Sequence, residues 1–132
     1  MRIGFANGCF DTFHEGHQHF LAECMQRCSW LIVAVNSDVS VRRLKGDSRP
    51  HNNAAYRMLR VHKYADSVIP FDGYEEGLIV NIKPDIVFRG YDQGALQLAK
   101  GTTCAIVQIS QLNGFSTTRI LNEAKRDAQD GP

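Results

Sequence analysis

The sequence predicts an α/β protein built on a doubly wound, five-stranded parallel sheet. Short apolar runs rich in β-branched residues alternate with segments whose apolar positions recur every three or four residues. This alternation of strand and helix signals is typical of a parallel sheet covered by helices. The length of 132 residues also fits one domain with one core. We therefore expect a single domain covering residues 1–132.

The first half of the chain supplies two predicted strands and one helix. Residues 2–6 form a short apolar run that ends in an Asn-Gly pair, which predicts a strand. A helix is expected over residues 13–28, because apolar side chains recur there at spacings of three and four. Residues 30–36, WLIVAVN, are almost entirely apolar, as in a strand buried on both faces of a sheet. The polar stretch after it, residues 37–53, predicts a long loop.

The second half continues the same alternation. Its predicted strands cover residues 67–71, 85–90 and 103–110. Its predicted helices cover residues 54–65, 74–83, a short segment at 95–100, and 116–129. Pro84 ends one of these helices, and Ser116 or Thr117 is a suitable cap for the last. The complete pattern is that of a Rossmann-like doubly wound sheet.

Composition argues against two classes of partner. Fifteen Lys and Arg oppose 14 Asp and Glu, a formal net charge of +1, so no overall field attracts nucleic acid. The longest apolar run is far shorter than the roughly 20 residues that cross a bilayer, and Met1 leads directly into a strand. The four cysteines lie in apolar periodic segments, which indicates free thiols. We expect a soluble, cytoplasmic protein that acts on small molecules.

Polar loops follow most of the predicted strands. In an open parallel sheet, ligands bind outside the carboxyl ends of the strands, where the strand order reverses. Loops with polar and glycine residues occupy those places at residues 7–17, 36–50, 89–94 and 111–118. Because these loops converge on one edge of the sheet, we expect the functional site there.

Three histidines in the first loop and helix differ in their expected directions. His14 and His17 are three residues apart, so they lie on the same side of a helix as the apolar stripe, whereas His19 points away toward solvent. A helix N-terminus offers unpaired N–H groups and a positive dipole end, so two inward imidazoles there suit phosphate binding. The structural alternative is two buried histidines bonded to backbone carbonyls.

Three motifs give the chain a family resemblance. GCFDTFHEGH (8–17) resembles the "HIGH" motif of the cytidylyltransferase-like nucleotidyltransferases, and RLKGDSRP (43–50) and GFSTTRI (114–120) resemble their later motifs. The motifs follow in order over nearly the whole chain. Residues 33–50 are most similar to the heptose 1-phosphate adenylyltransferase domain of ADP-heptose synthases.

The resemblance implies attack by a substrate phosphate on the α-phosphorus of a nucleoside triphosphate, with release of pyrophosphate. It implies that His14 and His17 hold the α- and β-phosphate region and that Lys45 reaches the α-phosphate or the acceptor phosphate. The remaining residues implied in nucleotide binding are Gly8, Phe10, Asp11, Arg57, Gly90, Asp92, Gly114, Ser116, Thr117 and Thr118. Mg²⁺ is expected with the triphosphate, where Asp11 either faces it or orients the loop, and no site made of side chains alone is predicted.

Alternatives remain for the base and the acceptor. ATP is favoured over CTP because Gln111, Leu112 and Asn113 stand where glycerol-3-phosphate cytidylyltransferases carry an Arg-Thr-Glu stretch. The expected acceptor is a sugar phosphate such as a heptose 1-phosphate. A CTP-dependent polyol phosphate cytidylyltransferase and a nucleotide sensor without turnover are the rival functions. A homodimer is left open by the resemblance.

Overall fold

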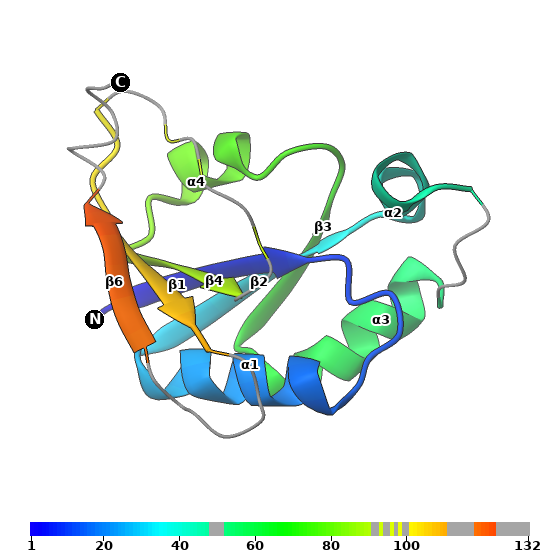
Figure 1. The fold of residues 1–132 in the computed structure, drawn as a ribbon, viewed down its shortest axis with the longest axis horizontal. Coiled ribbons are helices and arrows are strands. Elements are labelled where there is room, and N and C mark those ends of the chain that lie inside the picture. The colour runs from blue at the N-terminus through cyan, green and yellow to red at the C-terminus, as the bar shows by residue number, and fades with distance from the viewer. Residues whose placement is uncertain are drawn as a thin grey trace.

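The computed structural model describes residues 1–47, 52–90, 93, 96, 98 and 101–110, and the backbone of 118–123 (Figure 1). Its strands are β1 (Ile3–Gly8), β2 (Trp30–Asn36), β3 (Ser67–Phe71), β4 (Ile86–Gly90), β5 (Ala105–Ile109) and β6 (Thr118–Glu123). Its helices are α1 (Glu15–Gln26), α2 (Asp38–Lys45), α3 (Ala54–Val61), the 3₁₀ turn η1 (His62–Tyr64) and α4 (Glu76–Ile82).

The strands form one sheet in the order β3-β2-β1-β4-β5-β6. The first five strands are parallel, with Ile3 opposite Trp30 in β2 and Gly4 opposite Ile86 in β4. The chain therefore moves outward from β1 in one direction and later in the other, which places the switch in strand order at β1. The predicted Rossmann-like fold and its five parallel strands are confirmed.

Each face of the sheet carries its own core. On one face, Ala6 and Phe88 pack with Leu21 of α1 and Val61 of α3. On the other face, residues including Phe5 and Val87 pack with Ile79 of α4. Figure 1 shows α1 and α3 together on one side and α4 on the other. Neighbouring residues of β1 thus face opposite cores, which explains why the central strands are apolar at successive positions.

Helix α2 replaces part of the loop predicted for residues 37–53, so that prediction was wrong. Ser37 caps it, because its Oγ accepts a hydrogen bond from the Ser40 N–H at 3.1 Å. Val41 is fully buried and anchors the helix, while Arg42, Arg43 and Lys45 in the last turn suit the negative end of its dipole. The segment was predicted as a loop because it is mostly polar, but a helix at the surface needs apolar residues on one side only.

The helix predicted over residues 116–129 was also wrong. Residues Thr118–Glu123 form β6, antiparallel to β5, with Ile109 opposite Thr118. Pairing with the outer edge of β5 gives both backbones hydrogen-bond partners, and this tertiary gain overrides the local helix signal. The sheet therefore has a sixth strand that the sequence did not predict. The other residues of that predicted helix, and most of the one predicted at 95–100, lie outside the described residues.

Candidate active site

A cavity of about 810 Å³ opens at the carboxyl end of β1, where the strand order switches. Its walls come from the loop after β1, the start of α1, the end of α2, the segment before α4 and the ends of β4 and β5. Seven residues expected at the site line it, namely Gly8, Phe10, Asp11, His14, His17, Lys45 and Gly90. The described parts of the loops expected at residues 7–17, 36–50 and 89–94 thus meet at this edge, whereas residues 111–117 lie outside the described residues.

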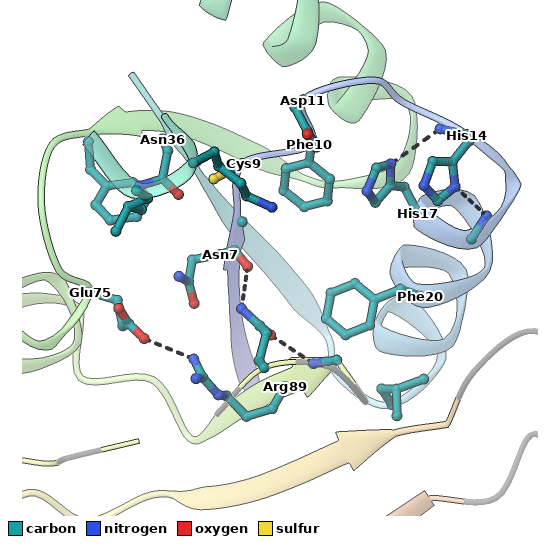
Figure 2. Close-up of a pocket in the computed structure, with 18 of the residues that line it drawn as sticks. Asn7, Cys9, Phe10, Asp11, His14, His17, Phe20, Asn36, Glu75 and Arg89 are labelled. Carbon is teal, nitrogen blue, oxygen red and sulfur yellow. Dashed lines mark hydrogen bonds and ion pairs between the residues drawn. The ribbon is translucent and has the colours of Figure 1, made fainter. Parts of the chain in front are cut away.

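His14 and His17 stack on each other at the first turn of α1, with ring centroids 3.9 Å apart and an interplanar angle of 22°. The His14 Nδ1 accepts a hydrogen bond from the Gly16 N–H at 3.0 Å, and the His17 Nδ1 accepts one from the His14 N–H at 3.2 Å. The two imidazoles thus form the capping box of the helix (Figure 2). Because Nδ1 is an acceptor in both rings, each neutral imidazole carries its proton on Nε2.

The close packing of this turn depends on Gly16. A Cβ added there would lie 2.9 Å from the His14 Cε1, closer than side-chain carbons approach one another. Any side chain at this position would push the His14 ring out of its stack. Gly16 therefore sets the position of the first imidazole. We refer to Phe10, His14, Gly16 and His17 together as the α1 end of the cavity.

Phe10 packs against the His17 ring and has an unusual backbone conformation with a positive φ. It is buried, its φ is +49°, and its ring meets the His17 ring edge-on at a centroid distance of 5.1 Å. Residues other than glycine seldom adopt a positive φ, and such strain occurs mainly at functional sites. Gly8 makes room for this ring, since a Cβ on Gly8 would lie 3.1 Å from it.

Arg57 does not meet the cavity, contrary to the expectation that it contacts a phosphate. Its side chain is fully buried, and Nε and Nη1 donate to backbone carbonyls while Nη2 pairs with Asp38 at 2.8 Å. The accepting carbonyls belong to Asn52, Cys9 and Asn36, at 2.7, 2.6 and 2.7 Å. With these bonds the guanidinium ties the loop after β1 to the end of β2 and to the segment before α3. Arg57 is a positioning residue in this structure.

Lys45 and Asp11 occupy different environments at the cavity. Lys45 ends α2, is exposed and lines the cavity, so its amine can reach a ligand there. Asp11 is 7% exposed, and its backbone carbonyl accepts from the Asn52 N–H at 3.0 Å. A buried carboxylate on the loop that leads to the two imidazoles is suited to a cation or to loop orientation.

Sequence reasoning missed a group on the far wall, which we call the α4 corner and define as Asn7, Tyr74, Glu75 and Arg89. Arg89 Nη1 donates to Glu75 Oε2 at 2.9 Å, and both side chains are largely buried. Asn7 near the end of β1 and Arg89 near the end of β4 could have been flagged as polar residues that interrupt buried strands. Glu75 could not have been recognised in this way, because it lies before α4 and not in a buried strand. Its pairing with Arg89 depends on how α4 connects to β4.

His19 corrects another expectation. It was predicted to face solvent, yet it lines the cavity, is half-buried, and has a buried Nε2 without a hydrogen-bond partner among the described residues. The predicted site residues Asp92, Gly114, Ser116 and Thr117 lie outside the described residues. Thr118 begins β6, where only the backbone is described.

The described residues contain no group of three His, Cys, Asp or Glu side chains placed to hold a metal. None of the four cysteines forms a disulfide bond. Burial raises the pKa of the Cys24 thiol well above its usual range, and burial also raises that of Cys28. Both therefore stay protonated at neutral pH. A Mg²⁺ ion fits this donor set only when phosphate oxygens supply most of its ligands, with Asp11 as the carboxylate at hand.

Comparisons with known proteins show the family to which this chain belongs. The cytidylyltransferase-like family profile matches residues 5–123. The bifunctional protein HldE of Rhodopseudomonas palustris (strain TIE-1) is 39% identical over 135 residues, covering 95% of this chain and 27% of that protein. HldE of Hydrogenovibrio crunogenus is 39% identical over 131 residues, covering 92% and 27%. This chain thus spans about a quarter of the length of these relatives.

A solved structure shares the fold as well. The crystal structure of the lipopolysaccharide core biosynthesis protein from Thermoplasma volcanium GSS1 matches with a TM-score of 0.62 and 31% identity, over 73% of this chain and 80% of that one. Fold, site and matches together indicate an enzyme of the nucleotidyltransferase class. The chain belongs to the cytidylyltransferase-like family. No helix in the described part of the chain is long and apolar enough to span a membrane.

Proposed function

We propose that this protein transfers a nucleoside monophosphate, preferably AMP from ATP, to a small phosphorylated acceptor. The acceptor we favour is a sugar phosphate such as a heptose 1-phosphate, and we place the reaction in the cytoplasm. The observation that carries the proposal is the stacked His14–His17 pair at the start of α1, on the wall of a cavity at the switch in strand order. A phosphate-binding end and a cavity large enough for two small substrates are what such a transfer requires.

The proposed step is an in-line displacement at phosphorus. An oxygen of the acceptor phosphate attacks the α-phosphorus, and a new P–O bond forms. The bond between the α-phosphorus and the oxygen that bridges to the β-phosphorus breaks, and pyrophosphate leaves with that oxygen. The attacking phosphate is already ionised, so no strong base is needed. The protein contributes mainly by placing positive charge and hydrogen-bond donors where negative charge develops.

The α1 end supplies these donors in the proposed mechanism. The hydrogen bonds to Nδ1 leave the Nε2–H of each imidazole as its donor, and the helix N-terminus adds the positive end of its dipole. One preorganised donor of this kind contributes about 2.7–4 kcal/mol to transition-state stabilisation. Lys45 approaches from α2 and adds a positive charge that forms no ion pair with the other described residues.

Mg²⁺ is expected to accompany the triphosphate. When bound it would neutralise part of the phosphate charge and orient the leaving pyrophosphate. Asp11 is the cavity carboxylate nearest in sequence to the histidines and is the residue we propose to face the ion. Nucleotide-binding roles for Asp92, Gly114, Ser116, Thr117 and Thr118 remain predictions from the family motifs.

Pyrophosphate release tests this proposal. Each of the four ribonucleoside triphosphates is offered with sugar 1-phosphates, including a heptose 1-phosphate, and with glycerol 3-phosphate. We expect release with ATP and a sugar phosphate, and none without an acceptor. A preference for CTP with glycerol 3-phosphate would replace the adenylyltransferase assignment by the polyol phosphate one. Binding of ATP without turnover in any combination would indicate a sensor and overturn the enzymatic proposal.

A further inference from the structure

The Oδ1 atom of Asn7 is one of the buried side-chain atoms on the cavity wall that have no hydrogen-bond partner among the described residues. Asn7 is 7% exposed and lines the cavity, and its Oδ1 makes no hydrogen bond to the described residues. Its backbone carbonyl, in contrast, accepts from the Gln93 Nε2 at 3.2 Å. Buried polar atoms in folded proteins are nearly always satisfied, so an orphan on a cavity wall points to a ligand that donates a hydrogen bond there.

The neighbouring ion pair determines which kind of ligand fits. The Glu75 and Arg89 side chains are only 15% and 7% exposed and lie 2.9 Å apart, so their charges largely cancel. A phosphate or carboxylate placed here would meet the Glu75 carboxylate at short range. Neutral hydroxyl groups meet no such repulsion, because they can donate to Glu75 and to Asn7 and accept from Arg89.

Tyr74 adds an apolar surface at the rim of the same corner. It lines the cavity although its side chain is 74% exposed, and it directly precedes Glu75. An exposed aromatic ring beside donors and acceptors offers one surface for the C–H groups of a sugar and another for its hydroxyls. A hydroxylated ring therefore matches this corner better than a charged or a purely apolar group does.

Figure 2 shows Glu75 and Arg89 on one side of the cavity and His14 and His17 on the other, with Asn7 between the two pairs. We propose that Asn7, Tyr74, Glu75 and Arg89 form the subsite for the uncharged, hydroxyl-bearing body of the acceptor, and that they select neutral sugars over charged ones. This inference rests on the proposed transfer, because it takes the α1 end as the place of the phosphates. The acceptor would then span the cavity, its phosphate toward the histidines and its ring toward α4.

Direct binding to the full chain tests the subsite without turnover. Calorimetry with saturating α,β-methylene-ATP, and also without it, compares mannose 1-phosphate, glucose 1-phosphate and glycerol 3-phosphate with propyl phosphate, which carries no hydroxyl. We expect at least one hydroxylated probe to bind about tenfold more tightly than propyl phosphate, since unpaired site groups penalise the latter. Equal or tighter binding of propyl phosphate than of all three would overturn the proposal.

Two variants examine the corner itself. Asn7→Leu, similar in size but apolar, should weaken the hydroxylated probes about tenfold and leave propyl phosphate and ATP within about twofold. Glu75→Gln removes the carboxylate charge that repels an acidic sugar at this corner, so glucuronic acid 1-phosphate should gain about fivefold or more relative to glucose 1-phosphate. Glu76→Gln is the matched control, because the same change is made at the next residue, which does not line the cavity.

The outcomes separate this inference from the proposed function. If Glu75→Gln leaves the preference between neutral and acidic sugar phosphates unchanged, the subsite assignment is wrong, whether or not Asn7→Leu folds. If the variants weaken ATP in place of the acceptor, the corner holds the nucleoside and the proposal fails. If sugar phosphates bind through Asn7 and Glu75 but no triphosphate yields pyrophosphate, the subsite stands and the transferase proposal fails.

Discussion

The two walls of the cavity are built by different means. At the α1 end, two imidazoles are held by backbone N–H groups and by a glycine that permits no side chain. At the α4 corner, side chains from distant parts of the chain meet through one ion pair, beside an exposed tyrosine. The first wall is fixed by a single helical turn, whereas the second depends on which side chains the crossover brings together. The first wall is therefore suited to the transfer step, which is the same for any acceptor. The second wall is suited to selecting among acceptors.

The largest expected effect is at the α1 end. His17→Ala should lower kcat about 100- to 1,000-fold, as the loss of one preorganised donor does. The fold should survive, because the ring contributes one capping hydrogen bond and lies at a cavity. Steady-state pyrophosphate release together with thermal unfolding checks both points. Near-normal turnover, or outright unfolding, would make the histidine a structural residue and remove the contrast between the walls.

Loss of the Arg57 side chain, which holds the loop before the α1 end, should lower the stability of the fold. Arg57→Ala leaves the carbonyls of Cys9, Asn36 and Asn52 without their donor, which should cost about 2–3 kcal/mol of unfolding free energy. Urea unfolding of this variant, with Arg60→Ala as a partly exposed arginine control on the same helix, measures the loss. A variant of normal stability with a weakened affinity for ATP would instead support the phosphate contact that the family motif suggested.

A smaller effect is expected from Gly16→Ala. The new Cβ would displace the His14 ring, and misplacement of a catalytic group by a fraction of an ångström should lower kcat about tenfold. The matched control is Gly77→Ala, since a Cβ at Gly77 meets nothing within 4 Å. Crystallography of the variant would show whether the ring has moved. Unchanged kcat with a displaced ring would mean that the position of His14 does not matter for transfer.

Lys45→Ala should also lower kcat, by about tenfold, while the unfolding free energy stays nearly the same. The side chain is exposed and contributes little to the core, but its charge lies on the cavity wall. Arg43→Ala, two residues earlier in α2 and absent from that wall, is the comparison. If both variants behave like the parent protein, the second family motif does not function in this chain.

The smallest expected effect is a pH dependence of stability caused by Cys24, which belongs to neither wall of the cavity. Burial raises the pKa of the Cys24 thiol in the folded state above its value in the unfolded chain. Below the ordinary thiol pKa of about 8.5 both states keep the proton, so stability is unaffected there. As pH rises further, the unfolded state ionises first and stability falls. Urea unfolding at pH 7 and pH 10 should show a larger loss for the parent protein than for Cys24→Ala, and equal losses would contradict this.

Sequence reasoning located the α1 end but not the α4 corner, for a physical reason. His14 and His17 are three residues apart, so helix geometry alone brings their rings together. Glu75 and Arg89 meet only after α4 crosses the sheet, and no local rule specifies that pairing. The five parallel strands followed from apolar runs buried on two faces, whereas β6 depends on the edge of β5 and α2 on a single buried valine. Arg57 is a second example. The family resemblance indicated this residue, but the backbone carbonyls that its guanidinium binds are brought together only by the fold.

The capping box of α1 joins two properties that most enzymes keep apart. The ring nitrogens that end the helix belong to the residues proposed to act on phosphate. Helix ends open and close continually in solution, and their amide hydrogens exchange with solvent only while they are open. Each opening of this first turn would also release both imidazoles. Hydrogen exchange at the Gly16 amide would then report the average fraction of time for which the first turn is closed and both imidazoles are held in place.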